Sequence, residues 1–155
     1  MTTKKFHTFV YLLTKKVVSM IIENEGISEL DAIQDFYQSD TYQLLEVEDT
    51  KYWWGFHLRL YMRSMWIVKG GMLVSKQSEF FILLIETYAH YRNIKGSEVL
   101  QMFRQNDLIT YIQDMYLQYH TETLQNAFDD LDEQLGLPSK VRLEGVRDNE
   151  VIIHG

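Results

Sequence analysis

Apolar residues recur at helical spacing from residue 78 to residue 135, and this regularity restricts the fold more than any other feature. Four successive stripes of apolar residues begin there, at Phe80, Val99, Leu108 and Leu124. Apolar residues three and four positions apart lie on one face of a helix, so each stripe predicts an amphipathic helix. The run 80–85 is apolar throughout, which indicates a helix buried on most of its sides. We therefore expect helices packed on helices.

The first half of the chain follows the same pattern. Apolar residues keep helical spacing over residues 6–22, and Gly26 then stands where a glycine commonly ends a helix. Ser28 and Asp31 have the spacing of a capping box, which predicts the start of a second helix. Asp40 predicts the start of a third, shorter helix.

Two later segments are harder to assign. In residues 52–68 the apolar positions alternate as in a strand but also satisfy a helix, and we favour the helix. Gly70 and Gly71 then interrupt the pattern and mark a boundary between two halves. Pro138 stops the last helix, since proline cannot continue one. The alternating apolar residues beyond it predict a short β-hairpin or a flexible tail.

These patterns predict an all-α protein, a compact helical bundle of about six to eight helices. We expect an N-terminal helical unit at 1–69, a C-terminal helical unit at 72–137, and a tail or small hairpin at 138–155. The two helical units are expected to pack as one globule, because small units seldom bury their apolar faces alone.

Part of the sequence repeats at an offset of 67 positions. Seven pairs of residues match or nearly match at this offset, among them Ile27 with Ile94 and Phe36 with Phe103. One interpretation is that the chain contains two pseudo-repeated copies of one helical unit. The other is that two amphipathic helices with similar caps share a few residues by chance.

Composition and charge exclude several classes of binding partner and functional site. The formal net charge of −7 argues against a general attraction to nucleic acid or anionic lipid. The absence of cysteine excludes disulfides, thiolate metal sites and a cysteine nucleophile. Lys15 and Lys16 interrupt the first apolar stretch, so we expect a cytoplasmic protein with neither signal peptide nor membrane span.

No motif for catalysis or metal binding stands out in the sequence. None of the five histidines forms the helical pair with an intervening glutamate that a zinc protease uses. We therefore predict a protein that is not an enzyme and has no metal or cofactor. His120 and Thr121 are predicted to lie between two helices and to stabilise that turn. The functional alternative is that His120 acts as a general base near Glu122.

Two regions are candidates for binding. Trp53, Trp54 and Trp66 are expected to form an interface anchor, because tryptophan is enriched at binding hot spots. An extended tail could instead add a strand to the edge of a partner's sheet. Its alternating apolar residues are Val141, Leu143, Val151 and Ile153. The alternative of nucleic-acid binding relies on the cations interleaved with these tryptophans, which are His57, Arg59 and Arg63.

The last predicted helix carries a group of acidic residues, Asp129, Asp130, Asp132 and Glu133. We expect these side chains to form the solvated face of the helix, opposite Phe128 and Leu131. The alternative is that they bind a basic partner.

The segment 78–135 resembles a family of small bacterial proteins, the domain of unknown function 3791. The resemblance depends on the order and spacing of short motifs rather than on any single one. In chain order these are Phe80-Phe81, Ile85-Glu86, Tyr88-Ala89, Gly96, Glu98-Val99, Phe103, Tyr111-Ile112, His120-Thr121 and Asp130-Leu131-Asp132. One departure follows His120-Thr121, where relatives usually carry a glycine-containing link and this chain has Glu122-Thr123-Leu124.

The first half more weakly resembles a small helical protein that accompanies this family. The residues that carry this resemblance are Gly26-Ile27-Ser28, Ala32, Phe36-Tyr37, Ser39 and Thr41-Tyr42. Members of the family tend to be encoded beside proteins that look like ADP-ribosyltransferases, as in toxin and antitoxin pairs. The resemblance thus implies a helical protein that binds a protein partner encoded in the same locus. Self-association into a homo-oligomer is compatible with this function.

Overall fold

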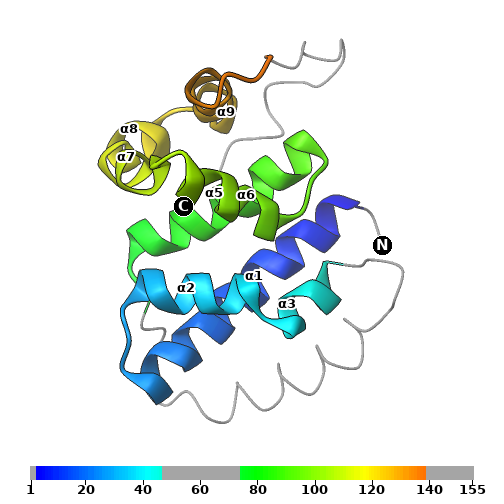
Figure 1. Cartoon of the computed structure of the whole chain (residues 1–155), viewed down its shortest axis with the longest axis vertical. Coiled ribbons are helices and arrows are strands. Elements are labelled where there is room, and N and C mark those ends of the chain that lie inside the picture. The colour runs from blue at the N-terminus through cyan, green and yellow to red at the C-terminus, as the bar shows by residue number, and fades with distance from the viewer. Residues whose placement is uncertain (1–2, 47–73, 139–155) are drawn as a thin grey trace. The chain divides into compact units, whose positions relative to one another are not determined.

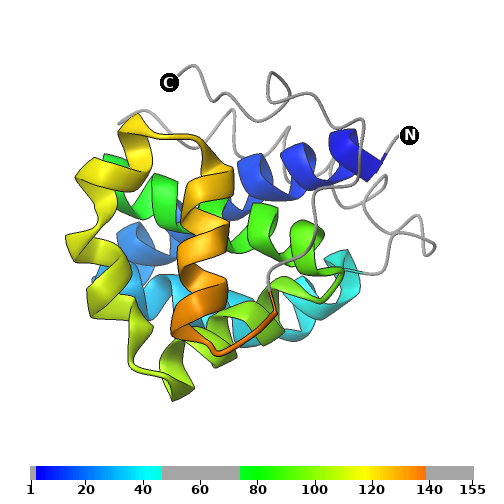
Figure 2. The same cartoon turned by 90° about the horizontal axis from the view of Figure 1, so that it is seen from above.

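The computed structural model describes residues 3–46 and 74–138, and these residues form eight α-helices (Figures 1 and 2). The helices are α1 Thr3–Glu25, α2 Glu29–Gln38, α3 Asp40–Leu45, α5 Lys76–Arg92, α6 Gly96–Gln105, α7 Leu108–Asp114, α8 Tyr116–Thr121 and α9 Leu124–Gln134. No strand occurs within these two ranges. The predicted all-α fold is confirmed. Residues 52–68 and the predicted tail or hairpin lie outside the described residues.

Serine side chains cap three of the helices at their N-termini. Ser28, Ser39 and Ser75 each accept a hydrogen bond from the backbone N–H three residues further on. Each bond satisfies one of the N–H groups that the first helical turn leaves without a partner. The capping role predicted for Ser28 is confirmed. Helix α3 begins at Asp40 as predicted, but its capping residue is Ser39.

Residues in the left-handed backbone region end three of the helices. Gly26 follows α1 with φ +66°, Asn93 follows α5 with φ 56°, and Gly136 follows α9 with φ +66°. After α9, the Leu137 N–H donates to the Asp132 carbonyl at 2.8 Å, which is the long bond of a Schellman motif. The prediction that Pro138 stops this helix is therefore wrong, since the glycine two residues earlier already turns the chain.

The third predicted stripe of apolar residues forms two helices rather than one. Helices α7 and α8 are separated at Met115, whose backbone has φ −81° and ψ 0°. The residues on both sides still share a buried face, because Ile112 and Tyr119 are buried. No glycine or proline marks this break.

The first compact unit extends to Met102. In it, α1 packs against α2 and α5, and α3 packs against α2 (Figure 1). The apolar run predicted to be buried forms the middle of α5, where Ile82, Leu84 and Ile85 are completely buried. These contacts place α2, α3 and α5 around one core.

The second compact unit begins at Phe103, and its described part contains α7, α8 and α9. Helix α8 packs against both α7 and α9 (Figure 2). Helix α9 buries the stripe predicted from the sequence, including Leu124, Phe128 and Leu131. The predicted boundary at Gly70 and Gly71 lies outside the described residues.

The helix bounds follow the offset found in the sequence. Helix α1 ends at Glu25 and α5 at Arg92, 67 positions later. Helix α2 spans residues 29–38 and α6 spans 96–105, again 67 positions later at both ends. The left-handed residues Gly26 and Asn93 are separated by the same interval. These correspondences favour the interpretation that a helical unit occurs twice.

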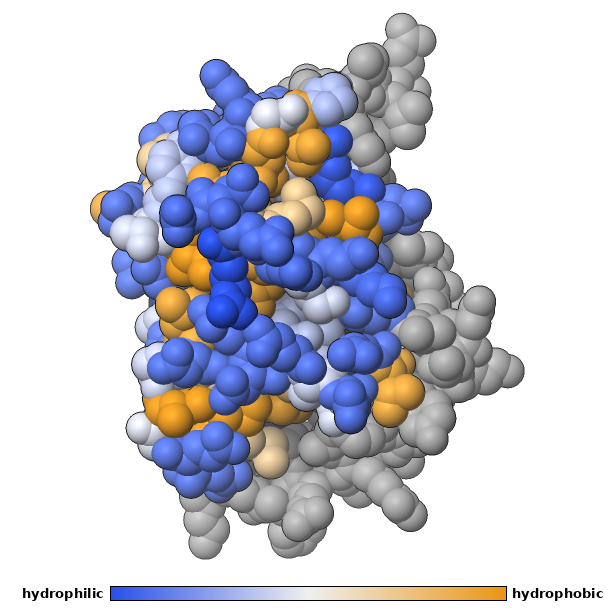
Figure 3. All heavy atoms as spheres, viewed as in Figure 1, coloured by the Kyte–Doolittle hydropathy of each residue, from blue (hydrophilic) through white to orange (hydrophobic). Residues whose placement is uncertain are grey.

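Two surface properties of the described residues are relevant to binding. No described helix combines the length and apolar character needed to cross a membrane. On the face seen in Figure 3, most described residues are hydrophilic and the hydrophobic surface is divided into separate patches.

Candidate functional site

A buried glutamate holds two tyrosines in the first unit. Glu86 of α5 is 3% exposed, and the buried residues that precede and follow it in this helix are apolar or aromatic. Its Oε1 accepts hydrogen bonds from Tyr37 Oη at 2.7 Å and from Tyr42 Oη at 2.6 Å. Both tyrosines are completely buried, and they come from α2 and α3. One oxygen atom therefore joins three helices.

The first residue of α6 closes this cluster because it has no side chain. A Cβ atom on Gly96 would overlap the hydroxyl of Tyr42. It would also lie 3.1 Å from Tyr37 Cε1 and 3.2 Å from Glu86 Oε1. Glycine thus lets the backbone of α6 approach the hydrogen-bonded side chains directly.

A second glutamate links the cluster to α6. Glu46, just after α3, accepts hydrogen bonds from the backbone N–H of Ser97 at 3.1 Å and from the Ser97 hydroxyl at 3.1 Å. A carboxylate here satisfies an N–H group of the first turn and lies at the positive end of the helix dipole. We name Tyr37, Tyr42, Glu46, Glu86 and Gly96 the Tyr–Glu cluster.

Burial dominates the electrostatics of the cluster. Burial raises the pKa of Glu86 to about 7, the hydrogen bonds from Tyr42 and Tyr37 oppose this rise, and the nearby Glu46 adds to it. Burial also raises the pKa of Glu46, although the bonds from Ser97 lower it. Burial, and then the charge of Glu86, raise the pKa values of Tyr37 and Tyr42 well above 10. Both hydroxyls therefore remain protonated and donate at physiological pH.

A similar arrangement occurs in the second unit. Asp130 Oδ2 of α9 accepts a hydrogen bond from Tyr111 Oη at 2.7 Å and another from Tyr119 Oη. Burial raises the pKa values of both tyrosines, and the bond to Asp130 raises them further. In each unit a carboxylate thus accepts from two tyrosines on other helices.

We expect the substitution Asp130→Ala to lower the free energy of unfolding by about 1 kcal/mol, because two tyrosine hydroxyls lose their acceptor. Urea unfolding followed by circular dichroism measures this loss. Asp129→Ala is the matched control: this exposed neighbour bonds only Gln125 one turn away among the described contacts, and its loss should cost less than about 0.5 kcal/mol. Equal effects of the two substitutions would contradict the role of Asp130.

The predicted acidic face of α9 is only partly correct. Asp129 and Glu133 are exposed, as expected for a solvated face. Asp132, however, is 1% exposed, and Asp130 is half-buried against the two tyrosines. The four acidic residues are nearly consecutive, so they point in different directions around the helix.

Two histidine rings meet in the first unit. The rings of His7 on α1 and His90 on α5 have centroids 4.6 Å apart. Burial, with a contribution from His90, lowers the pKa of His7 to about 4. His7 is therefore neutral at physiological pH, and its Nδ1 has no hydrogen-bond partner among the described residues. Those residues contain no group of three or more side chains suited to holding a metal ion.

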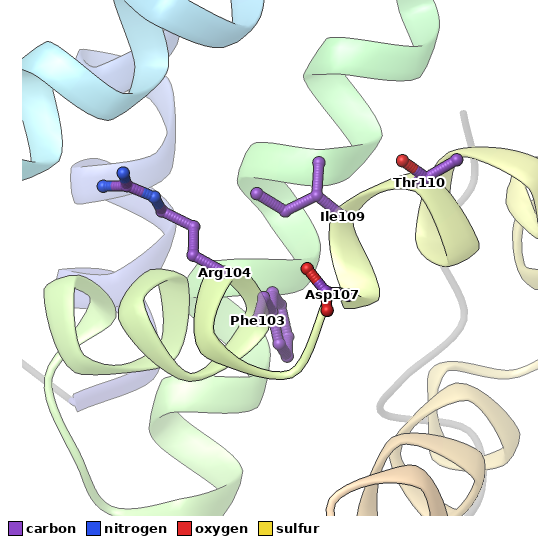
Figure 4. Close-up of a pocket in the computed structure, with 5 residues that line it drawn as sticks. All are labelled: Phe103, Arg104, Asp107, Ile109 and Thr110. Atoms are coloured by element: carbon purple, nitrogen blue, oxygen red, sulfur yellow. The ribbon is translucent and has the colours of Figure 1, made fainter.

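A shallow pocket of about 240 Å³ lies at the turn between α6 and α7. Its lining residues are Phe103, Arg104, Asp107, Ile109 and Thr110. Figure 4 shows that the Arg104 and Thr110 side chains point away from each other. The polar groups of this pocket do not converge on one point, as they would in a specific ligand site.

The structure places His120 and Thr121 at the end of α8 rather than in the turn that follows it. Thr121 Oγ1 donates to the carbonyl of Leu117 at 3.0 Å, and the His120 ring stacks on Tyr116 with centroids 5.3 Å apart. The other predicted site residues lie outside the described residues and remain predictions. They are Trp53, Trp54, Trp66, Val141, Leu143, Val151, Ile153, His57, Arg59 and Arg63.

Sequence reasoning did not single out the Tyr–Glu cluster as a site. One signal was present in the sequence, since Glu86 stands four residues after Ile82 and three before Ala89, and both of these neighbours on the helix face are apolar. A charged residue at such a position needs a buried hydrogen-bonding partner. The partners Tyr37 and Tyr42 lie 49 and 44 residues away, and helical periodicity carries no information about such pairs.

The described part of the chain is thus an all-α protein in which carboxylate and tyrosine clusters join the helices. Residues 79–135 match the model of a family described as "Protein of unknown function (DUF3791)", which confirms the resemblance found in the sequence. The match covers a little over a third of the chain and includes Glu86 and Gly96, but not Tyr37 or Tyr42. Neither the curated proteins nor the solved structures gave a match.

Proposed function

We propose that this chain is a non-enzymatic protein–protein interaction module and acts as the antitoxin-like partner of a neighbouring ADP-ribosyltransferase-like protein. The proposal is supported by the contacts that the family segment makes with the helices that precede it in the chain. Glu86, Gly96 and Ser97 of that segment contact Tyr42, Tyr37 and Glu46, which precede it in the chain. A segment that binds a helix pair through buried, specific contacts is suited to recognising protein surfaces.

The two halves of the chain resemble two separate proteins, the family and its companion, and this supports the same function. Residues that mark the family, Glu86 and Gly96, meet residues that mark the companion protein, Tyr37 and Tyr42. The site where they meet would serve as a contact between two proteins if the halves were separate chains. The family's association with ADP-ribosyltransferase-like neighbours then supplies the class of partner.

A growth assay tests the antitoxin-like function. We expect the neighbour-encoded ADP-ribosyltransferase-like protein to slow growth when expressed alone, and co-expression of this chain to restore growth. Replacing Trp53, Trp54 or Trp66 by alanine should weaken the protection, since loss of a buried anchor costs about 2 kcal/mol or more. Truncation at Pro138 tests the tail in the same assay.

Leu12→Ala is the control, because it removes an exposed leucine of α1 that belongs to neither predicted binding region. Unchanged toxicity in the presence of abundant, folded chain would contradict the antitoxin-like function.

A further inference from the structure

The negative charge of the chain is concentrated in the second unit. Residues 105–138 contain seven carboxylates and no lysine or arginine. The net charge of the whole chain is also −7, because the other 15 acidic residues are matched by the 15 basic residues. Five of the seven carboxylates are exposed, and these are Asp107, Asp114, Glu122, Asp129 and Glu133. The described part of this unit also contains one cation, the exposed Arg104, so its surface is strongly but not exclusively negative.

A large apolar side chain is exposed on the same unit. Leu117 of α8 is 74% exposed, more than the other exposed large apolar residues of the described part, Leu12 at 54% and Leu44 at 46%. A single exposed leucine is ordinary, but this one has aromatic neighbours. His120 lies three residues further along α8, on the same side as Leu117, and is exposed. Tyr116 stacks on His120.

We name Tyr116, Leu117 and His120 the α8 surface. Asp114 stands three residues before Leu117 and Glu122 five residues after it, and both carboxylates are exposed. An apolar and aromatic centre with a charged rim is the composition of a protein-binding surface.

We propose that the α8 surface binds a basic protein partner, whose lysine and arginine side chains surround an apolar pocket that receives Leu117. This inference rests on the proposed function and identifies the surface and the chemistry of the partner. The negative charge of the unit favours a basic partner, since opposite charges steer association and like charges oppose it. A second copy of this chain would bring two negative surfaces together, so charge disfavours self-association through this surface.

A pair of synthetic peptides tests the surface without the natural partner. Both are amphipathic helices of about 14 residues, one made of leucine and lysine and the other of leucine and glutamate. Binding to the full chain is measured by fluorescence anisotropy, and the site by the shifts of backbone amide signals in NMR spectra. We expect the lysine peptide to bind and to shift signals of residues 114–122, and the glutamate peptide not to bind.

Matched variants separate the apolar and the charged contributions. Leu117→Ser should weaken binding of the lysine peptide by about tenfold or more, whereas Leu12→Ser should change it less than about twofold. The pair Asp114→Asn and Glu122→Gln should reduce the salt dependence of binding. The pair Glu23→Gln and Glu25→Gln removes the same charge from exposed positions of α1 and should not reduce it.

Three results would overturn the proposal: equal binding of both peptides, amide shifts confined to other residues, or unchanged affinity of Leu117→Ser. Because the peptides replace the natural partner, none of these results bears on the growth assay. A chain that protects against the toxin but fails these tests would use another surface. A chain that passes them without protecting would have the α8 surface but not the antitoxin-like function.

Discussion

The variant Glu86→Gln should be more stable than the wild-type protein at neutral and alkaline pH. Glutamine keeps an oxygen that accepts from Tyr37 and Tyr42, but it carries no charge to bury. In the folded wild type the pKa of Glu86 is about 7, against its ordinary value of 4.5. The folded state thus holds the proton more tightly than the unfolded state.

The sign of the pH dependence follows from this difference. A raised carboxyl pKa stabilises the fold fully below about pH 4.5, and the stabilisation is lost as the pH rises to about 7. The full shift corresponds to about 3 kcal/mol of the free energy of unfolding. We expect the stability advantage of Glu86→Gln to grow by about 2 kcal/mol between about pH 5 and about pH 8.

His7 makes the comparison with the variant necessary. The pKa of His7 is lowered to about 4, so the unfolded state binds this proton more tightly. This contribution makes stability rise with pH up to about 6.5, against the effect of Glu86. His7 is present in both proteins, and subtracting the two urea-unfolding profiles isolates Glu86. A constant difference between the profiles would contradict the buried, protonated state of this side chain.

The substitution Gly96→Ala should destabilise the protein by about 3 kcal/mol or more. At an ordinary helical position alanine is favoured over glycine by about 1 kcal/mol, so the expected effect has the opposite sign. The reason is that the added Cβ overlaps the Tyr42 hydroxyl, and Tyr42 is bonded to Glu86. The tyrosine cannot move away without leaving the buried carboxylate with one donor fewer.

Two glycines of the same chain serve as controls for Gly96→Ala. Gly26 and Gly136 have nothing within 4 Å of an added Cβ, and only their φ of +66° disfavours alanine. Each should cost about 1 to 2 kcal/mol. Tyr42→Phe removes the overlapped hydroxyl, so its effect combined with Gly96→Ala should be smaller than the sum of the two by about 1 kcal/mol. Strict additivity in urea unfolding would contradict the steric account.

The sequence predicted local features of the fold better than the contacts between helices. Ser28 and Gly26 were identified because capping and the left-handed backbone region depend on residues close in the chain. The break at Met115 was missed because the apolar face continues across it. The helix end at Gly136 was assigned to Pro138 instead, although the glycine supplies the turn.

The candidate site was harder to predict than the helices. Glu86 and Gly96 stood among the family motifs, but neither showed a function in the sequence, because their partners lie in the first half of the chain. Asp130 was taken for a solvated acid because Tyr111 and Tyr119 approach it only in the folded unit. Both cases depend on pairs of side chains distant in sequence, which residue periodicity does not encode.

The proposed function requires that this chain bind a protein partner in its own host. The most direct measurement is native purification of the tagged protein from its own host, with the mass and identity of co-eluting proteins determined by mass spectrometry. We predict a stoichiometric complex with a neighbour-encoded protein. Elution of the chain alone, or only with further copies of itself, would contradict the binding of a protein partner.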